Sequence, residues 1–160
     1  MQFLHLCLGL VAAAQRVAAD PAEFDTEGPV PERGPLIKVT ELVRKLPNIT
    51  DDQFHAYWAN AHVHRVLSVK AFTDRIVRYN QVHIYPEDRA LAAEFSSVVP
   101  DYDGIAELWF NSVEDWRTIV NDPEQIAVVD ADSTVFVRQP YAMTIGYDHL
   151  VVGPDWESKL

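Results

Sequence analysis

Residues 50–66 read TDDQFHAYWANAHVHRV, and this stretch decides the fold because it predicts a helix with a marked start and an apolar face. Thr50 followed three residues later by Gln53 forms the pattern of a capping box. At about 100° per residue, one stripe of the helix faces a core. The stripe contains Phe54, Trp58, Ala61 and Arg65, with Tyr57 beside it. The stretch therefore predicts an amphipathic helix that packs on a core.

Histidines flank this stripe on opposite edges. His62 lies about one turn from Trp58, whereas His64 lies near Tyr57. The two imidazoles do not converge on one point, so we do not expect them to hold a metal.

Four segments have the alternation or composition of β-strands, and they are residues 36–44, 76–84, 103–110 and 143–152. In the first, Ile37, Val39 and Val43 share one side. In the third, Glu107 lies between Ile105 and Trp109 on one face, as a buried carboxylate with a partner or as an edge residue.

The second strand has a polar face. Period two places Val77, Tyr79, Gln81 and His83 together. A row of tyrosine, glutamine and histidine does not suit a dry core, so it is either a solvated face or the polar lining of a cavity.

The remaining segments complete the domain. Residues 86–102 are charged and longer than a hairpin needs, which is typical of a long loop. Ser112 with Asp115 starts a second helix, and Asp122 with Pro123 starts a further short turn of helix.

Four blocks together resemble the EthD-like family: LVRKLPNITDDQFHAYWANAH at 42–62, RYNQVHI at 78–84, DGIAELWFNSVEDW at 103–116 and MTIGYDHLVV at 143–152. The resemblance implies an α+β fold of the ferredoxin-like βαββαβ type that dimerises into a dimeric α+β barrel. Many members have His-Gly-Pro after the tryptophan, where this chain has His62-Val63-His64.

A length of 160 residues and an ordinary globular composition predict one domain. We expect it at residues 36–153, after an irregular leader at 20–35 and before a tail at 154–160. Residues 1–19 match a possible signal peptide, with an apolar run and small residues before Asp20, although no basic residue precedes the run. The location is therefore left between the cytoplasm and the secretory pathway.

Charge and cysteine content exclude several classes of protein. A net charge of −11 disfavours nucleic-acid and anionic-membrane partners. The single cysteine, Cys7, excludes an intrachain disulfide framework and a cysteine-built zinc site. No G-x-S-x-G, P-loop, G-x-G-x-x-G or H-E-x-x-H motif occurs, so no cofactor or metal is expected.

Imidazole chemistry beside aromatic walls remains. We expect His62 and His83 to face one pocket between helix and sheet and to act as an acid/base pair. The residues expected to bind a planar substrate are Tyr57, Trp58, Tyr79, Gln81 and Glu107.

The family resemblance implies the reaction. Its fungal members look like tailoring enzymes of secondary metabolism, which suggests a cofactor-independent lyase, either decarboxylase or dehydratase, acting on an aromatic polyketide. The alternatives are a cofactor-free monooxygenase (oxidoreductase) of anthrone-type substrates and a non-catalytic barrel that binds small molecules. The expected partners are a small aromatic substrate and a second copy of the chain in a homodimer.

Overall fold

The computed structural model describes residue 30 and residues 33–152. The expected signal peptide, the expected tail and most of the expected leader lie outside these residues. Within them, every helix is too short or too polar to cross a bilayer.

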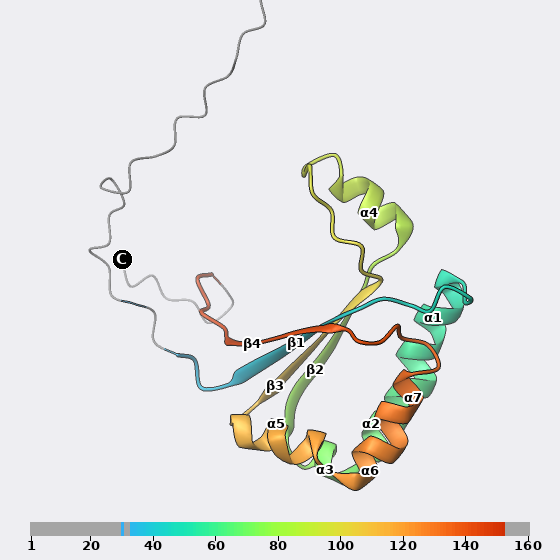
Figure 1. Ribbon diagram of the computed structural model, residues 1–160. Coiled ribbons are helices and arrows are strands. Elements are labelled where there is room, and N and C mark those ends of the chain that lie inside the picture. The colour runs from blue at the N-terminus through green and yellow to red at the C-terminus, as the bar shows by residue number, and fades with distance from the viewer. Residues whose placement is uncertain (1–29, 31–32, 153–160) are drawn as a thin grey trace, which may run out of the picture. The chain divides into compact units, whose positions relative to one another are not determined.

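The domain contains one four-stranded antiparallel sheet with helices on one face (Figure 1). Its strands are β1 (Ile37–Val43), β2 (Ile76–His83), β3 (Gly104–Phe110) and β4 (Ala142–Tyr147), in the order β2-β3-β1-β4. This order with two helical crossovers is the ferredoxin-like βαββαβ arrangement, so the predicted α+β fold class is confirmed.

Two helical segments cover one face of this sheet (Figure 1). The first runs through α1 (Asp51–Tyr57), the π-helix η2 (Trp58–His62), α2 (Val63–Ser68) and α3 (Lys70–Thr73). The second runs through α5 (Val113–Val120), α6 (Pro123–Gln125), the π-helix η3 (Ile126–Asp130) and α7 (Ala131–Ser133).

The predicted helix starts are confirmed. Thr50 Oγ1 accepts from the Gln53 backbone N–H at 3.2 Å, and the Gln53 side chain accepts from the Thr50 N–H at 2.9 Å. Ser112 caps α5 in the same way by accepting from the Asp115 N–H at 3.1 Å. These bonds satisfy backbone donors that a helix start leaves free.

The predicted stripe of the first helix is wrong beyond Trp58. Phe54 and Trp58 are buried as expected, but His62 and Val66 follow them into the core, and Arg65 is exposed. The cause is η2, because a π-helical turn holds one residue more than an α-helical turn. That extra residue moves every later position on the helix by one.

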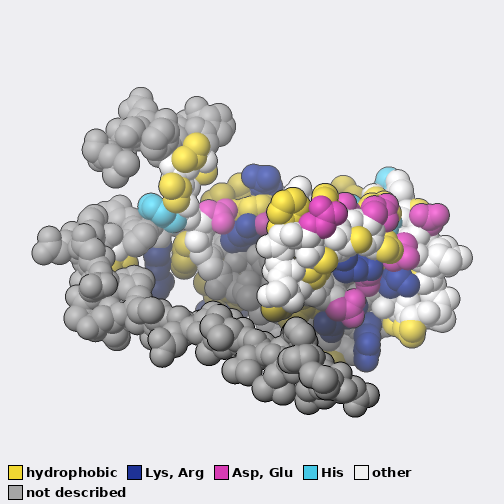
Figure 2. All heavy atoms as spheres, turned by 90° about the horizontal axis from the view of Figure 1, so that it is seen from above, with side chains coloured by type: hydrophobic (Ala, Val, Ile, Leu, Met, Phe, Trp, Pro, Cys, Tyr) yellow, Lys and Arg dark blue, Asp and Glu magenta, His cyan; other side chains and the backbone are white. Residues whose placement is uncertain are grey.

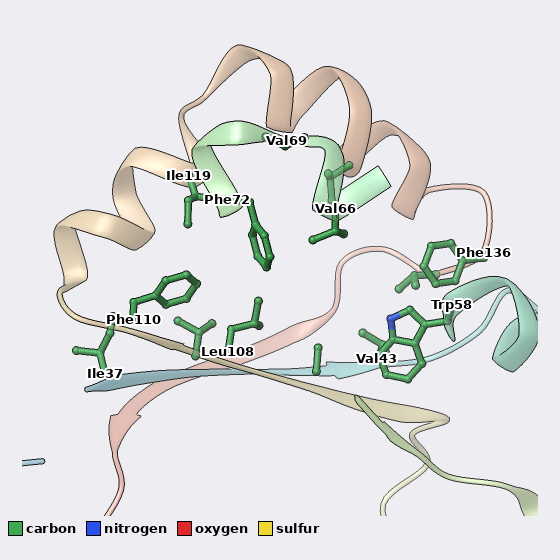
Figure 3. Packing of buried hydrophobic residues seen from close by; sticks show 14 of the residues in the cluster. Ile37, Val43, Trp58, Val66, Val69, Phe72, Leu108, Phe110, Ile119 and Phe136 are labelled. Carbon is green, nitrogen blue, oxygen red and sulfur yellow. The ribbon is translucent and has the colours of Figure 1, made fainter. Parts of the chain in front are cut away.

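The core lies between the helices and the sheet, as Figure 3 shows. Val66 of α2 and Phe72 of α3 point toward the strands, and Leu108 points from β3 toward the helices. Trp58 and Phe136 pack at the far end of this core.

Two local predictions need correction. A bulge between Ile76 and Arg78 puts Ile76 on the helix side of the sheet and leaves Val77 exposed. The expected loop at 86–102 begins with a helix, α4 (Pro86–Ala92), because Pro86 suits a first helical position and the Asp88 carboxylate accepts from the Tyr85 N–H at 2.9 Å. This helix projects away from the sheet (Figure 1).

One face of the domain carries both signs of charge. On the face shown in Figure 2, acidic and basic side chains are interspersed with apolar ones.

Candidate active site

A cavity of about 490 Å³ lies between the sheet and the two helical segments. The apolar part of its wall includes Val66, Phe72 and Leu108, which Figure 3 shows facing one another across this space. Its polar wall includes Glu41, His62, Tyr79, Asp130 and Tyr141. The volume is in the range of small-molecule sites, and a largely apolar wall with a few polar groups is typical of them.

A buried histidine–aspartate pair stands on one side of this cavity. His62 Nδ1 lies 2.9 Å from Asp132 Oδ2, and both side chains are more than nine-tenths buried. A carboxylate can only accept, so Nδ1 carries the hydrogen and Nε2 is left with a free lone pair. Burial lowers the pKa of His62, and the Asp132 carboxylate opposes part of that shift. The imidazole is therefore a neutral base at neutral pH.

Asp132 is fixed by two further donors. Tyr57 donates its hydroxyl to Oδ1 at 2.5 Å, and Arg65 Nε lies 3.0 Å from the same oxygen. These contacts satisfy a carboxylate that would be costly to bury alone. Tyr57 thus supports the histidine through Asp132.

Glu41 faces the cavity from the middle of β1. It shares its side of the strand with the buried Ile37, Val39 and Val43. Burial raises the pKa of Glu41 to about 7, a hydrogen bond from Tyr141 at 3.4 Å acts in the opposite direction, and the nearby Asp130 adds to the rise. A carboxyl group with this pKa can hold a proton near neutral pH and act as an acid.

Two tyrosines complete the polar wall. Burial raises the pKa of Tyr79 to about 12, and it raises the pKa of Tyr141 as well. Both hydroxyls therefore keep their protons at neutral pH and can donate hydrogen bonds.

His83 lies outside this cavity, so the predicted meeting of His62 and His83 in one pocket is wrong. His83 is at the end of β2, where its Nδ1 lies 2.8 Å from Nδ1 of the buried His55. The two histidines line a separate, more open depression with Asp52 and Tyr85. His62 is the last residue of η2, and its side chain contacts Asp132 and does not meet His83 as predicted.

Three other predicted substrate contacts do not line the cavity: Tyr57, which donates to Asp132 instead, Trp58 and Glu107. Trp58 is 2% exposed in the core, where its ring rests on Gly104 so closely that a Cβ there would lie 2.3 Å from it. Glu107 pairs in register with Thr40 and Asn80, on the sheet face opposite the cavity. There it binds Lys38 at 2.5 Å and accepts from Asn80 at 2.9 Å, and the Lys38 ammonium holds the pKa of that carboxyl below its usual range.

Among the predicted residues, the structure brings His62 and Tyr79 to the cavity, with Gln81 hydrogen-bonded to Tyr79 at 2.7 Å. Sequence reasoning missed Glu41 and Asp132. A signal for Glu41 was present, since a glutamate on the apolar side of a strand is unusual. Asp132 is separated from His62 by 70 residues, and no local pattern marks it.

The described residues contain no group of three His, Cys, Asp or Glu side chains placed to hold a metal ion.

The chain is similar in sequence to a known family and to a characterised protein of that family. The EthD domain model matches residues 46–140. A conidial pigment biosynthesis dehydratase EthD from Metarhizium robertsii is 29% identical over 129 residues, which are 77% of this chain and 88% of that protein.

Solved structures share the fold at low identity. A dimeric protein with a ferredoxin-like fold from Bacteroides fragilis has a TM-score of 0.51 at 10% identity, over 73% of this chain and 100% of that one. An EthD family protein from Bacillus halodurans has a TM-score of 0.50 at 13% identity, over 71% of this chain and 99% of that one. Because the EthD domain model matches more than half of its residues, the chain belongs to the EthD domain family.

Proposed function

We propose that this protein is a cofactor-independent dehydratase that removes water from a β-hydroxy ketone in an aromatic polyketide pathway. The observation that carries the proposal is that His62, which is paired with the buried Asp132, and the acidic Glu41 line one cavity. Loss of water needs a base at the α-carbon and an acid at the leaving hydroxyl. The resemblance to a conidial pigment biosynthesis dehydratase supports the same reaction class.

Each residue then has one task. His62 Nε2 takes the proton from the α-carbon, and Asp132 stabilises the imidazolium that forms. Glu41 gives its proton to the leaving hydroxyl, so the carbon–oxygen bond breaks and water departs as the double bond forms. Transfer of a proton from His62 to Glu41 through solvent restores both groups.

The charge of the cavity favours dehydration over decarboxylation. Glu41 and Asp130 both face it, and among the described residues that line it there is no lysine or arginine. A substrate carboxylate would find no cation to pair with, whereas a neutral hydroxy ketone needs none.

A β-hydroxy tetralone tests the proposal, because its dehydration gives a fluorescent naphthol. The wild-type protein should form the naphthol equally well with and without oxygen, and with a metal chelator present. Removal of one acid/base group should lower the rate by about 10²- to 10⁴-fold in His62→Gln and Glu41→Gln.

Matched controls are available on the surface. His64→Gln changes an exposed histidine two residues from His62, and Glu94→Gln changes an exposed carboxylate in the turn that follows α4. Both should keep the wild-type rate. A rate that depends on oxygen would favour the monooxygenase, and binding without turnover would favour the non-catalytic barrel. Faster release of carbon dioxide from the matching β-keto acid would favour the decarboxylase.

A further inference from the structure

Gln81 makes three hydrogen bonds that link the cavity to the His55–His83 pair. Its Nε2 donates to the Tyr79 hydroxyl oxygen at 2.7 Å and to the Trp58 backbone carbonyl at 3.3 Å. Its Oε1 lies 3.3 Å from His83 Nε2. The side chain lies on the helix side of β2 and reaches the backbone of Trp58, the first residue of η2.

The Trp58 carbonyl fixes which way the Gln81 amide points. A carbonyl can only accept, so the amide must present its nitrogen there, and the flipped amide would set two oxygens against each other. Both hydrogens of Nε2 are then used, one on Trp58 and one on Tyr79. Oε1 remains for His83, whose Nε2 must donate.

This orientation decides where the Tyr79 proton can go. The Tyr79 oxygen already accepts from Gln81, so its own hydrogen must point away from Gln81. No acceptor for that hydrogen occurs among the residues described, and Tyr79 lines the cavity. The phenol is therefore a directed donor without a partner.

The direction of the Gln81–His83 hydrogen bond also fixes the tautomers of His83 and His55. With Nε2 of His83 donating, its Nδ1 is an acceptor, so His55 Nδ1 donates to it at 2.8 Å. His55 Nε2 is then an acceptor, and it is a buried atom without a hydrogen-bond partner in the described part of the chain. The pair thus holds Gln81 in one orientation from the side opposite to Tyr79.

We propose that the Tyr79 hydroxyl donates to the ketone oxygen of the substrate as the enolate forms, and that Gln81 is a positioning residue that aims this donor. This assignment rests on the proposed dehydratase function and adds the recognition of a carbonyl oxygen that becomes an enolate. A preoriented donor at the site of developing charge is a strong source of transition-state stabilisation. The ligand class that follows is flat bicyclic phenols, whose oxygen can accept a hydrogen bond from Tyr79 at the place of the substrate ketone oxygen.

Binding of a naphthol tests this without turnover. Titration followed by naphtholate fluorescence should show that the wild-type protein binds naphthol at least about tenfold more tightly than methylnaphthalene, which has the same shape but no hydroxyl. Tyr79→Phe should remove this preference. A wild-type protein that prefers methylnaphthalene, or binds neither, overturns the inference.

Three changes on β2 separate aiming from packing. Gln81→Met removes the donor but leaves Tyr79 free to turn, so it should lose part of the preference. Gln81→Glu places an acceptor beside Tyr79, which turns the phenol hydrogen away from the cavity, so it should lose all of it. Acidification should restore binding in Gln81→Glu, because the protonated carboxyl can donate again. A purely structural role predicts no such pH dependence.

The control is Asn80→Asp, which makes the same amide-to-carboxylate change one residue away on the opposite sheet face. It should keep the wild-type preference. If Gln81→Glu does not fold, Tyr79→Phe and Gln81→Met carry the test, and wild-type preference in Tyr79→Phe refutes the proposal. Dehydration of the tetralone by the wild type is measured in parallel, so loss of the proposed function and loss of the Tyr79 contact are told apart.

Discussion

At the scale of the residue, His62 and Glu41 set the pH dependence of the proposed reaction. His62 works as a base only when neutral, and burial lowers its pKa, so the acidic limb lies below the ordinary range of histidine. Glu41 works as an acid only when protonated, and burial raises its pKa to about 7. We expect a bell-shaped profile of kcat/KM that falls as the pH rises through about 7. A rate that keeps rising above pH 8 would remove Glu41 from the acid role.

Glu41 should also cost stability. Its pKa rises from 4.5 to about 7 on folding because of burial, so its contribution is fully favourable below 4.5 and is lost as the pH rises toward 7. The Glu41→Gln variant carries no charge at this position. At pH 8 its free energy of unfolding should exceed that of the wild type by roughly 1–3 kcal/mol, and its melting temperature should be higher. At pH 4 the difference should disappear. Equal melting temperatures at pH 8 would mean that the carboxylate is well solvated.

At the scale of the element, η2 behaves as a one-residue insertion in the first helix. If Asn60 were deleted and the helix became a regular α-helix, His62 would lie three positions after Trp58, and Val66 would lie seven positions after Trp58. This is the spacing of residues that face a core. Deletion of Asn60 should therefore keep the fold and shift His62 by about 1.5 Å along the axis. Such a displacement can cost about 10²-fold in rate.

Thermal unfolding and tetralone turnover of the deletion variant check this expectation. Asn60→Ala is the control, because it removes only the side-chain bond to the Ala56 carbonyl at 2.8 Å. It should keep most of the activity. A deletion variant that does not fold would show instead that the packing requires the π-helical turn.

The elements also show how far local patterns reach. Strand alternation, the Thr50 capping box and the Ser112 cap are local, so β1, β3, α1 and α5 were predictable from the sequence. No local pattern in the sequence marks the extra residue of η2, whose last residue, His62, contacts Asp132 of α7 across 70 positions. Because of this extra residue, His62 contacts Asp132 where the sequence predicted it at the helix edge, and His83 contacts His55. The candidate site was therefore only half predictable.

At the scale of the whole molecule, the sheet face without helices carries an apolar row. Val82, Ile105, Leu42 and Ala142 lie in register across all four strands. A sheet face of this kind is stabilised when a partner covers it. We propose that a second copy covers this face in a symmetric dimer, as the resemblance to the family implied.

Sedimentation of the wild type and two lysine variants tests the dimer. Ile105→Lys places a charge in the centre of the apolar row and should give a monomer at micromolar concentration. Leu91→Lys makes a similar change on α4, where the side chain is 55% exposed, and should leave the dimer intact. A wild-type monomer at this concentration contradicts the proposal. Because the cavity lies on the helix-covered side of the sheet and Ile105 lies on the other side, a folded Ile105→Lys monomer should still bind naphthol.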